Sequence, residues 1–88
     1  MRLYDAMTSL PAGKRLQYAD ARGTTAVIDV EVTTAGTLYA VLRAQTTGAM
    51  GQPWATSRGY AMSARADCRG LEQALRDLGL DPDHYSIA

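Results

Sequence analysis

The sequence of 88 residues has no phenylalanine, one cysteine (Cys68) and one histidine (His84). A single cysteine cannot form a disulfide within the chain, and the N-terminal residues contain no apolar run of the kind found in signal peptides. No apolar stretch approaches the roughly 18 residues that a membrane-spanning helix needs. We therefore expect a protein of the reducing cytoplasm.

The scarcity of histidine and cysteine also bears on catalysis. Hydrolases of the familiar types pair a nucleophile with a base, and His84 lies close to the C-terminus, after the end of the last expected helix. One cysteine and one histidine do not complete a tetrahedral zinc site, and the acidic segment 81–85 is typical of a solvated turn. The sequence also lacks a phosphate-binding loop of the GxxxxGK[ST] type. We therefore predict no catalytic residues, no metal and no cofactor.

Charge and core size limit the remaining functions. Nine basic and nine acidic residues cancel, which weighs against nonspecific binding to nucleic acid or to anionic membranes. The hydrophobic content is 47%, but alanine is the commonest residue within it, so the core of this single domain (residues 1–88) is expected to be thin. A partner protein or self-association would be a natural supplement to such a core.

Hydrophobic spacing in the first half of the chain predicts a helix followed by a β-hairpin. Residues 2–10 carry apolar side chains at helical spacing and stop at Pro11, whereas residues 14–22 fit either an edge strand or an extended arm. Residues 24–45 alternate around Gly36, which predicts a hairpin with a three-residue loop, Thr34 to Gly36. That loop sets the pairs Val32 with Leu38, Val30 with Ala40, and Ile28 with Leu42, and a one-residue slip would place Arg43 on the apolar face.

The second half predicts a loop, a strand and a helix. Residues 46–53 contain two glycines and a proline, typical of a loop, and residues 54–61 alternate between bulky and small side chains, with the small side expected under a helix. Apolar residues from Cys68 to Leu78 then recur at helical spacing, and Gly79 can end that helix. Because Cys68 belongs to the apolar stripe, we interpret it as a packing residue rather than a nucleophile.

These elements predict an α+β domain in the order helix, strand, strand, strand, helix. We expect a three- or four-stranded antiparallel sheet, in which residues 14–22 supply the optional edge strand, with the C-terminal helix across one face and the short N-terminal helix beside it. The order of the strands is left open.

The aromatic residues favour a binding surface. Every aromatic side chain is a tyrosine or the single tryptophan, and these two types, with arginine, are enriched in protein-binding hot spots. We expect Trp54, Tyr39, Arg43 and Arg58 to be displayed together on the exposed face of the sheet, with burial of Trp54 in the core as the alternative. The leading hypothesis is thus a non-enzymatic protein-binding module, such as a small regulator, an adaptor or an inhibitor of the kind that phages and plasmids carry.

Two other function classes stay open. Arg58, Arg65 and Arg69 lie near the start of the C-terminal helix, where they could bind a phosphate, and the element order resembles that of double-stranded RNA-binding domains. That resemblance implies RNA binding, but the lysine cluster that those domains carry at the second helix is replaced here by SARADCRG, in which Asp67 separates two arginines. The third class is a small enzyme whose site is completed by dimerisation.

Overall fold

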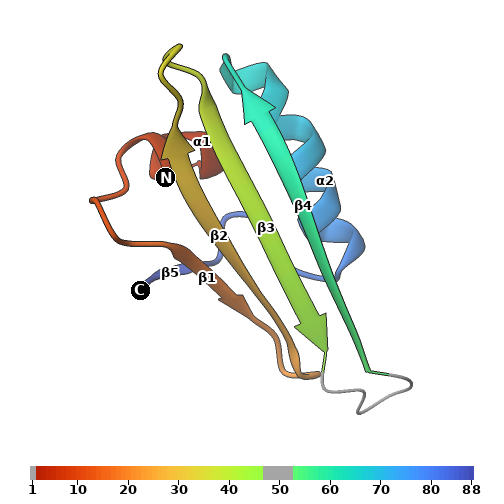
Figure 1. Ribbon diagram of the computed structural model, residues 1–88. Coiled ribbons are helices and arrows are strands. Elements are labelled where there is room, and N and C mark those ends of the chain that lie inside the picture. Colours follow the sequence, from red (N-terminus) through yellow and green to blue (C-terminus); the bar gives the residue numbers. More distant parts are fainter. Residues whose placement is uncertain (1, 47–52) are drawn as a thin grey trace.

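A five-stranded antiparallel sheet forms one layer of the protein, and two helices on a single face of the sheet form the other (Figure 1). The computed structural model describes residues 2–46 and 53–88, so most of the loop expected at 46–53 lies outside the described residues. Along the chain the elements are α1 (Leu3–Thr8), β1 (Leu16–Ala19), β2 (Thr24–Val32), β3 (Leu38–Thr46), β4 (Trp54–Met62), the 3-10 turn η1 (Arg65–Cys68), α2 (Arg69–Asp77) and β5 (Ser86–Ile87).

The α+β class and both helices are confirmed, and the sheet is larger than expected. Strand order is β4-β3-β2-β1-β5, so β1 answers the open question at residues 14–22 by pairing with β2. The fifth strand was not predicted, because β5 has only two residues and no alternating pattern of its own. It pairs with β1 beside Leu16 and Gln17.

The hairpin between β2 and β3 has the predicted register. Val32 pairs with Leu38, Val30 with Ala40 and Ile28 with Leu42. Gly36 has a φ of 81°, and the Thr33 N–H donates to the Thr37 carbonyl at 2.9 Å, which closes the three-residue loop. The left-handed backbone at Gly36 is what allows the loop to match the twist of the two strands.

Helix α2 also ends as its sequence predicts. Gly79 has a φ of 83°, its N–H donates to the Arg76 carbonyl at 2.9 Å, and the Leu80 N–H donates to the Leu75 carbonyl at 3.0 Å. This pair of bonds is a Schellman motif, and it folds Leu80 back into the core. At the other end, the Asp67 carboxylate accepts the N–H groups of residues 63 and 64, which fixes the turn between β4 and α2.

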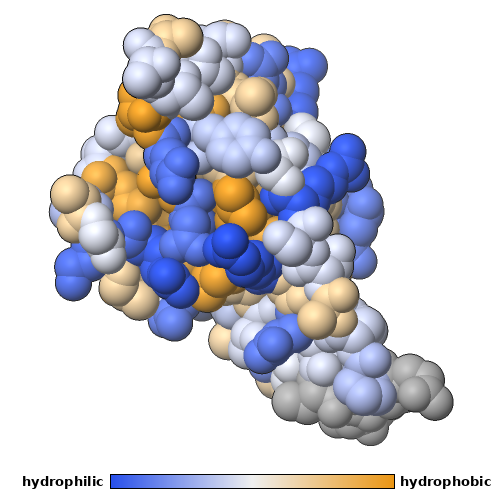
Figure 2. All heavy atoms as spheres, viewed as in Figure 1, coloured by the Kyte–Doolittle hydropathy of each residue, from blue (hydrophilic) through white to orange (hydrophobic). Residues whose placement is uncertain are grey.

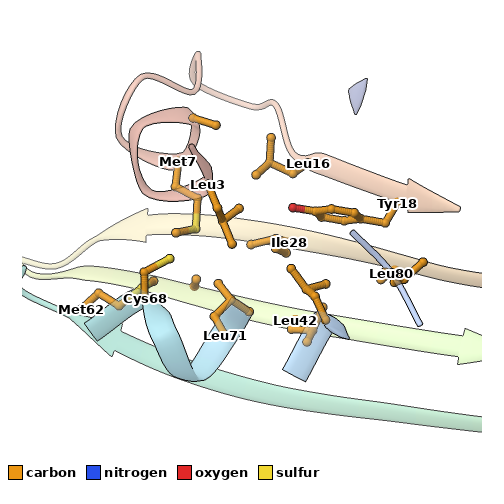
Figure 3. Packing of buried hydrophobic residues seen from close by; sticks show 14 of the residues in the cluster. Leu3, Met7, Leu16, Tyr18, Ile28, Leu42, Met62, Cys68, Leu71 and Leu80 are labelled. Carbon is orange, nitrogen blue, oxygen red and sulfur yellow. The ribbon is translucent and has the colours of Figure 1, made fainter. Parts of the chain in front are cut away.

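The core lies between the sheet and the two helices. Figure 3 shows Leu3 and Met7 of α1 in one cluster with Cys68 of η1, Leu71 of α2 and Ile28 of the sheet. On the sheet the buried side chains come from alternate positions of β1, β2 and β3, and only Met62 of β4 is buried. The hydrophobic core is therefore thick over β1, β2 and β3 and thin along β4.

The two sides of β4 are reversed relative to the sequence prediction. Pairing of Leu42 with Arg58 and of Ala40 with Tyr60 places the bulky side of β4 on the face that carries the helices. The small side lies on the opposite face, so the expectation that a helix covers it is wrong. The buried side chain of Met62 fixes this parity, because its alternate neighbours along the strand must share its face. Neither helix in the described parts of the chain is long and apolar enough to cross a membrane.

Candidate functional site

The face of the sheet opposite the helices, here called the open face, is covered by no helix of residues 2–46 and 53–88. Figure 2 looks onto this face and shows hydrophobic side chains exposed between hydrophilic ones. The strand pairings and the burial pattern assign to it the alternate residues of four strands. They are Gln17, Ala19, Thr25, Val27, Asp29, Glu31, Tyr39, Val41, Arg43, Gln45, Ala55, Ser57, Gly59 and Ala61.

Tyr39 lies across the edge strand on this face. A Cβ built on Gly59 would overlap the Tyr39 hydroxyl group, so the ring occupies the space that any larger residue at position 59 would need. Gly59 pairs with Val41, and Tyr39 pairs with Ala61, so the ring reaches its glycine along the diagonal. Glycine weakens a strand unless a neighbouring ring covers it, and Tyr39 supplies that cover here.

Ion pairs organise the centre of the open face. Asp29 receives Arg15 at 3.1 Å and Arg43 at 2.6 Å, one arginine on each carboxylate oxygen. Such exposed pairs contribute little to stability, but they restrict the two guanidinium groups to the region above the half-buried Val41. A shallow hollow of about 390 Å³ lies here, lined by the three residues of this network with Lys14, Glu31 and Val41 among others. Three cationic and two anionic side chains line this hollow, so its lining has a net charge of +1.

The four predicted partner-binding residues divide between the two faces. Tyr39 and Arg43 lie on the open face, whereas Trp54, at the start of β4, and Arg58, in its middle, lie on the packed face. The expectation that all four are displayed together is therefore wrong, because even and odd positions of a strand point to opposite sides. Trp54 is 39% exposed and is thus not a core residue.

The three arginines near the start of α2 have separate environments. Arg65 donates two hydrogen bonds to the Asp5 carboxylate, at 2.6 and 2.9 Å, and lies 5.6 Å from the centre of the Tyr4 ring. Those bonds lower the pKa of Asp5. Arg58 instead stacks over the Tyr60 ring at 5.2 Å, and Arg69 is exposed on the first turn of α2.

Sequence reasoning missed Asp5 as the partner of Arg65. The two residues are 60 positions apart, and only the packing of α1 against η1 brings them together. A carboxylate on the first turn of a helix is a common capping residue, so no local pattern marked it as the counter-ion of a distant arginine. The pair removes much of the positive charge expected at this spot.

The structure offers little to nucleophilic or metal chemistry. Cys68 is fully buried, and its burial raises the pKa of the thiol to about 11, which keeps it protonated at neutral pH. Within residues 2–46 and 53–88 no group of three or more histidine, cysteine or acidic side chains is placed to hold a metal ion. Tyr18 is also buried, and its hydroxyl donates to the Pro82 carbonyl at 2.8 Å, a structural tie between β1 and the C-terminal segment.

Comparisons with known proteins add no family to this description. The chain matches no model of a known protein family, no curated protein and no solved structure.

Proposed function

We propose that the protein is a non-enzymatic protein-binding module that binds its partner on the open face of the sheet. The observation that carries the proposal is the composition of that uncovered face at its centre. Two half-buried valines, Val27 and Val41, lie there with Tyr39 and with the paired Arg43. Apolar area with a tyrosine and an arginine beside it is the composition of interface hot spots.

The geometry of Arg43 supports this function. Its bond to Asp29 holds the guanidinium group before any partner arrives, so less side-chain entropy is lost on binding. Because Arg15 and Arg43 share the single carboxylate of Asp29, the network retains one unit of positive charge. The partner surface that fits is an apolar side chain flanked by a carboxylate, which would complete the pairing of the second arginine.

The proposed mode of action is the occupation of a surface. A module of this kind acts by occupying a surface of its partner, as small regulators, adaptors and inhibitors do. Its affinity would depend on how well the valines are excluded from water, and its rate of association on the charge of the arginines.

The test compares two double variants, each of which removes one aromatic residue and one arginine from one face of the sheet. One is Tyr39→Ala with Arg43→Ala on the open face, and its matched control is Trp54→Ala with Arg58→Ala on the packed face. Tyr39 and Trp54 are 38% and 39% exposed, so the two variants remove similar aromatic surface. Each tagged protein is used to capture partners from a bacterial lysate, with and without nuclease, after circular dichroism has shown that it is folded.

We expect the open-face variant to lose its captured protein by tenfold or more and the control variant to retain it. Equal retention by both variants contradicts the proposal. Captured RNA or DNA that disappears with nuclease or moderate salt would instead favour the nucleic-acid alternative, in which Arg58, Arg65 and Arg69 are the residues to replace next.

A further inference from the structure

Within residues 2–46 and 53–88, no strand pairs with the outer edge of β4, and the hairpin shows which of its backbone groups face outward. The Thr33 N–H donates to the Thr37 carbonyl, so odd-numbered residues of β3 bond to β2 and even-numbered residues bond to β4. On β4 the residues bonded to β3 are therefore the even-numbered ones. The N–H and C=O groups that point away from the sheet belong to Ala55, Ser57, Gly59 and Ala61.

This edge carries few of the features that usually keep strand edges apart, and Arg58 is its one charged residue. Its pairing with β3 is continuous over nine residues without a bulge, and Trp54–Met62 contains no proline, no lysine and one charge, Arg58. The opposite edge of the sheet is different, because β5 has only two residues, Ser86 and Ile87. Long, regular edge strands are templates for the addition of another strand, and short ones are not.

We propose that a second copy of this chain adds to the edge, so that two β4 strands pair antiparallel about a twofold axis at Gly59. Gly59 then faces Gly59 of the second copy, and Ser57 faces its Ala61, so outward N–H and C=O groups meet in both directions. Seven residues of each strand pair, over about 23 Å at roughly 3.3 Å per residue. The two sheets become one sheet of ten strands.

Charge favours this register over the one with its axis at Arg58. An axis at Arg58 would set the two copies of Arg58 directly opposite each other, which is destabilising. With the axis at Gly59, Arg58 lies opposite Tyr60 of the second copy instead. Arg58 already stacks on its own Tyr60 at 5.2 Å, so the cross-strand arrangement repeats a contact that the chain makes by itself.

The helix layer agrees with the same axis. Gly70 of α2 lies beside the Tyr60 ring, since a Cβ there would be 3.9 Å from the ring, and α2 runs back along β4 in the opposite direction (Figure 1). Gly59 precedes Tyr60 by one residue, which is a distance of about 3.3 Å along the strand. About two residues of a helix, at roughly 1.5 Å each, cover the same distance. The level of the axis on α2 is therefore near Glu72, two residues after Gly70.

A level near Glu72 places small side chains of the two helices at the same height. Gly70 of one copy falls at the level of Ala74 of the other, because both lie two residues from Glu72. Small side chains at Gly70 and Ala74 allow the two helices to approach.

The size of a stable interface can be set against the surface of this chain. Standard interfaces bury roughly 800 Å² on each partner, which is about a seventh of the 5586 Å² that this chain exposes. The dimer also joins the two open faces, with the Tyr39 rings on either side of the axis, so the inference extends the proposed function without resting on it.

The first test is sedimentation equilibrium of the purified protein over a wide range of concentration, with Ser57→Pro and its control Ser57→Ala. Proline at residue 57 removes an N–H that bonds to none of the five described strands, so we expect the fold to be retained while the edge is blocked. We expect a reversible dimer for the wild type and for Ser57→Ala, and at least a tenfold weaker dimer for Ser57→Pro. A monomer at all concentrations, or a folded Ser57→Pro variant that dimerises normally, overturns the proposal.

The second test measures the axis directly. Gln73→Cys places a thiol close to the axis, and the native Cys68 is buried. Gln45→Cys places a thiol on the open face far from the axis, because it pairs with Ala55 near the start of β4, four residues from Gly59. A short bifunctional maleimide should cross-link Gln73→Cys into dimers and leave Gln45→Cys monomeric. Equal cross-linking of the two variants contradicts this register. A dimer that forms through another surface would also be detected in this way.

Discussion

The two faces of the sheet are formed by the same strands but differ in how far their side chains are buried. On the packed face, Leu16, Ile28 and Leu42 are covered by two helices and are almost completely buried. On the open face, the alternate residues of the same strands include Val27 and Val41, which stay half-exposed between charged neighbours. One face therefore supplies the stability of the fold, and the other retains apolar area that folding leaves unused. That difference separates the residues that hold the molecule together from those that can bind another one.

The largest effect expected is on the packed face, from Leu71→Ala. Leu71 is fully buried between α2 and the sheet, and replacing such a leucine by alanine costs about 2 to 5 kcal/mol, including the cavity that remains. Val41→Ala on the open face should cost about 1 kcal/mol or less, since its side chain is already half in water. Urea denaturation of both variants measures the contrast. Similar losses for the two would mean that the open face carries as much of the stability as the core.

The next effect concerns the thiol of the packed face. Burial raises the pKa of Cys68 to about 11, and the side chain has no access to water. Because only the thiolate reacts, alkylation of the native protein at pH 8 should be at least about a hundredfold slower than that of an ordinary thiol with a pKa near 8.5. Mass spectrometry after a timed pulse of iodoacetamide gives the rate. Denatured protein is the control and should react at the ordinary rate, whereas rapid native reaction would place Cys68 outside the core.

A smaller effect tests the packing of the Tyr39 ring over Gly59 on the open face. Gly59→Ala should displace the Tyr39 ring, whose hydroxyl occupies the space of the new methyl group. In a Tyr39→Ala background the same substitution meets no ring. The two changes should therefore be coupled by about 1 kcal/mol in a double-mutant cycle. Free energies of unfolding for the wild type, the two single variants and the double variant give the coupling. Additive losses would show that the ring does not depend on the glycine.

Most of the packed face could be predicted from the sequence, because its signals are local. The alternation around Gly36 was enough for the strand register, and the Cys68 to Leu78 stripe with Gly79 was enough for the helix and its end. Each of these patterns repeats within a few residues, so it does not depend on distant parts of the chain. The class of the fold followed from them.

The parity of β4 and the partners of the arginines could not be predicted in that way. Residues Trp54–Met62 alternate between bulky and small side chains, and the sequence alone does not show which side faces the helices. In the structure Met62 is buried, so the bulky side faces them. The choice depends on where η1 packs, which is a contact between elements rather than a pattern within one. The pairing of Arg65 with Asp5 has the same origin. Predictions of surfaces fail at such points because a one-residue change of phase moves a side chain to the other face.

The smallest effect expected lies at the rim of the packed face, where Asp5 of α1 binds Arg65 of η1. The bonds from Arg65 lower the pKa of Asp5 in the folded protein, so the pair stabilises the fold above the ordinary aspartate pKa near 3.9 and loses that contribution as the pH falls through the lowered folded value. Asp5→Asn removes the titrating group, so its loss of stability relative to the wild type should be present at pH 6 and should shrink below about pH 4. Urea midpoints measured for both proteins between pH 6 and pH 2 give this difference. A difference that is the same at every pH would mean that the carboxylate contributes through packing of the α1 turn rather than through its charge.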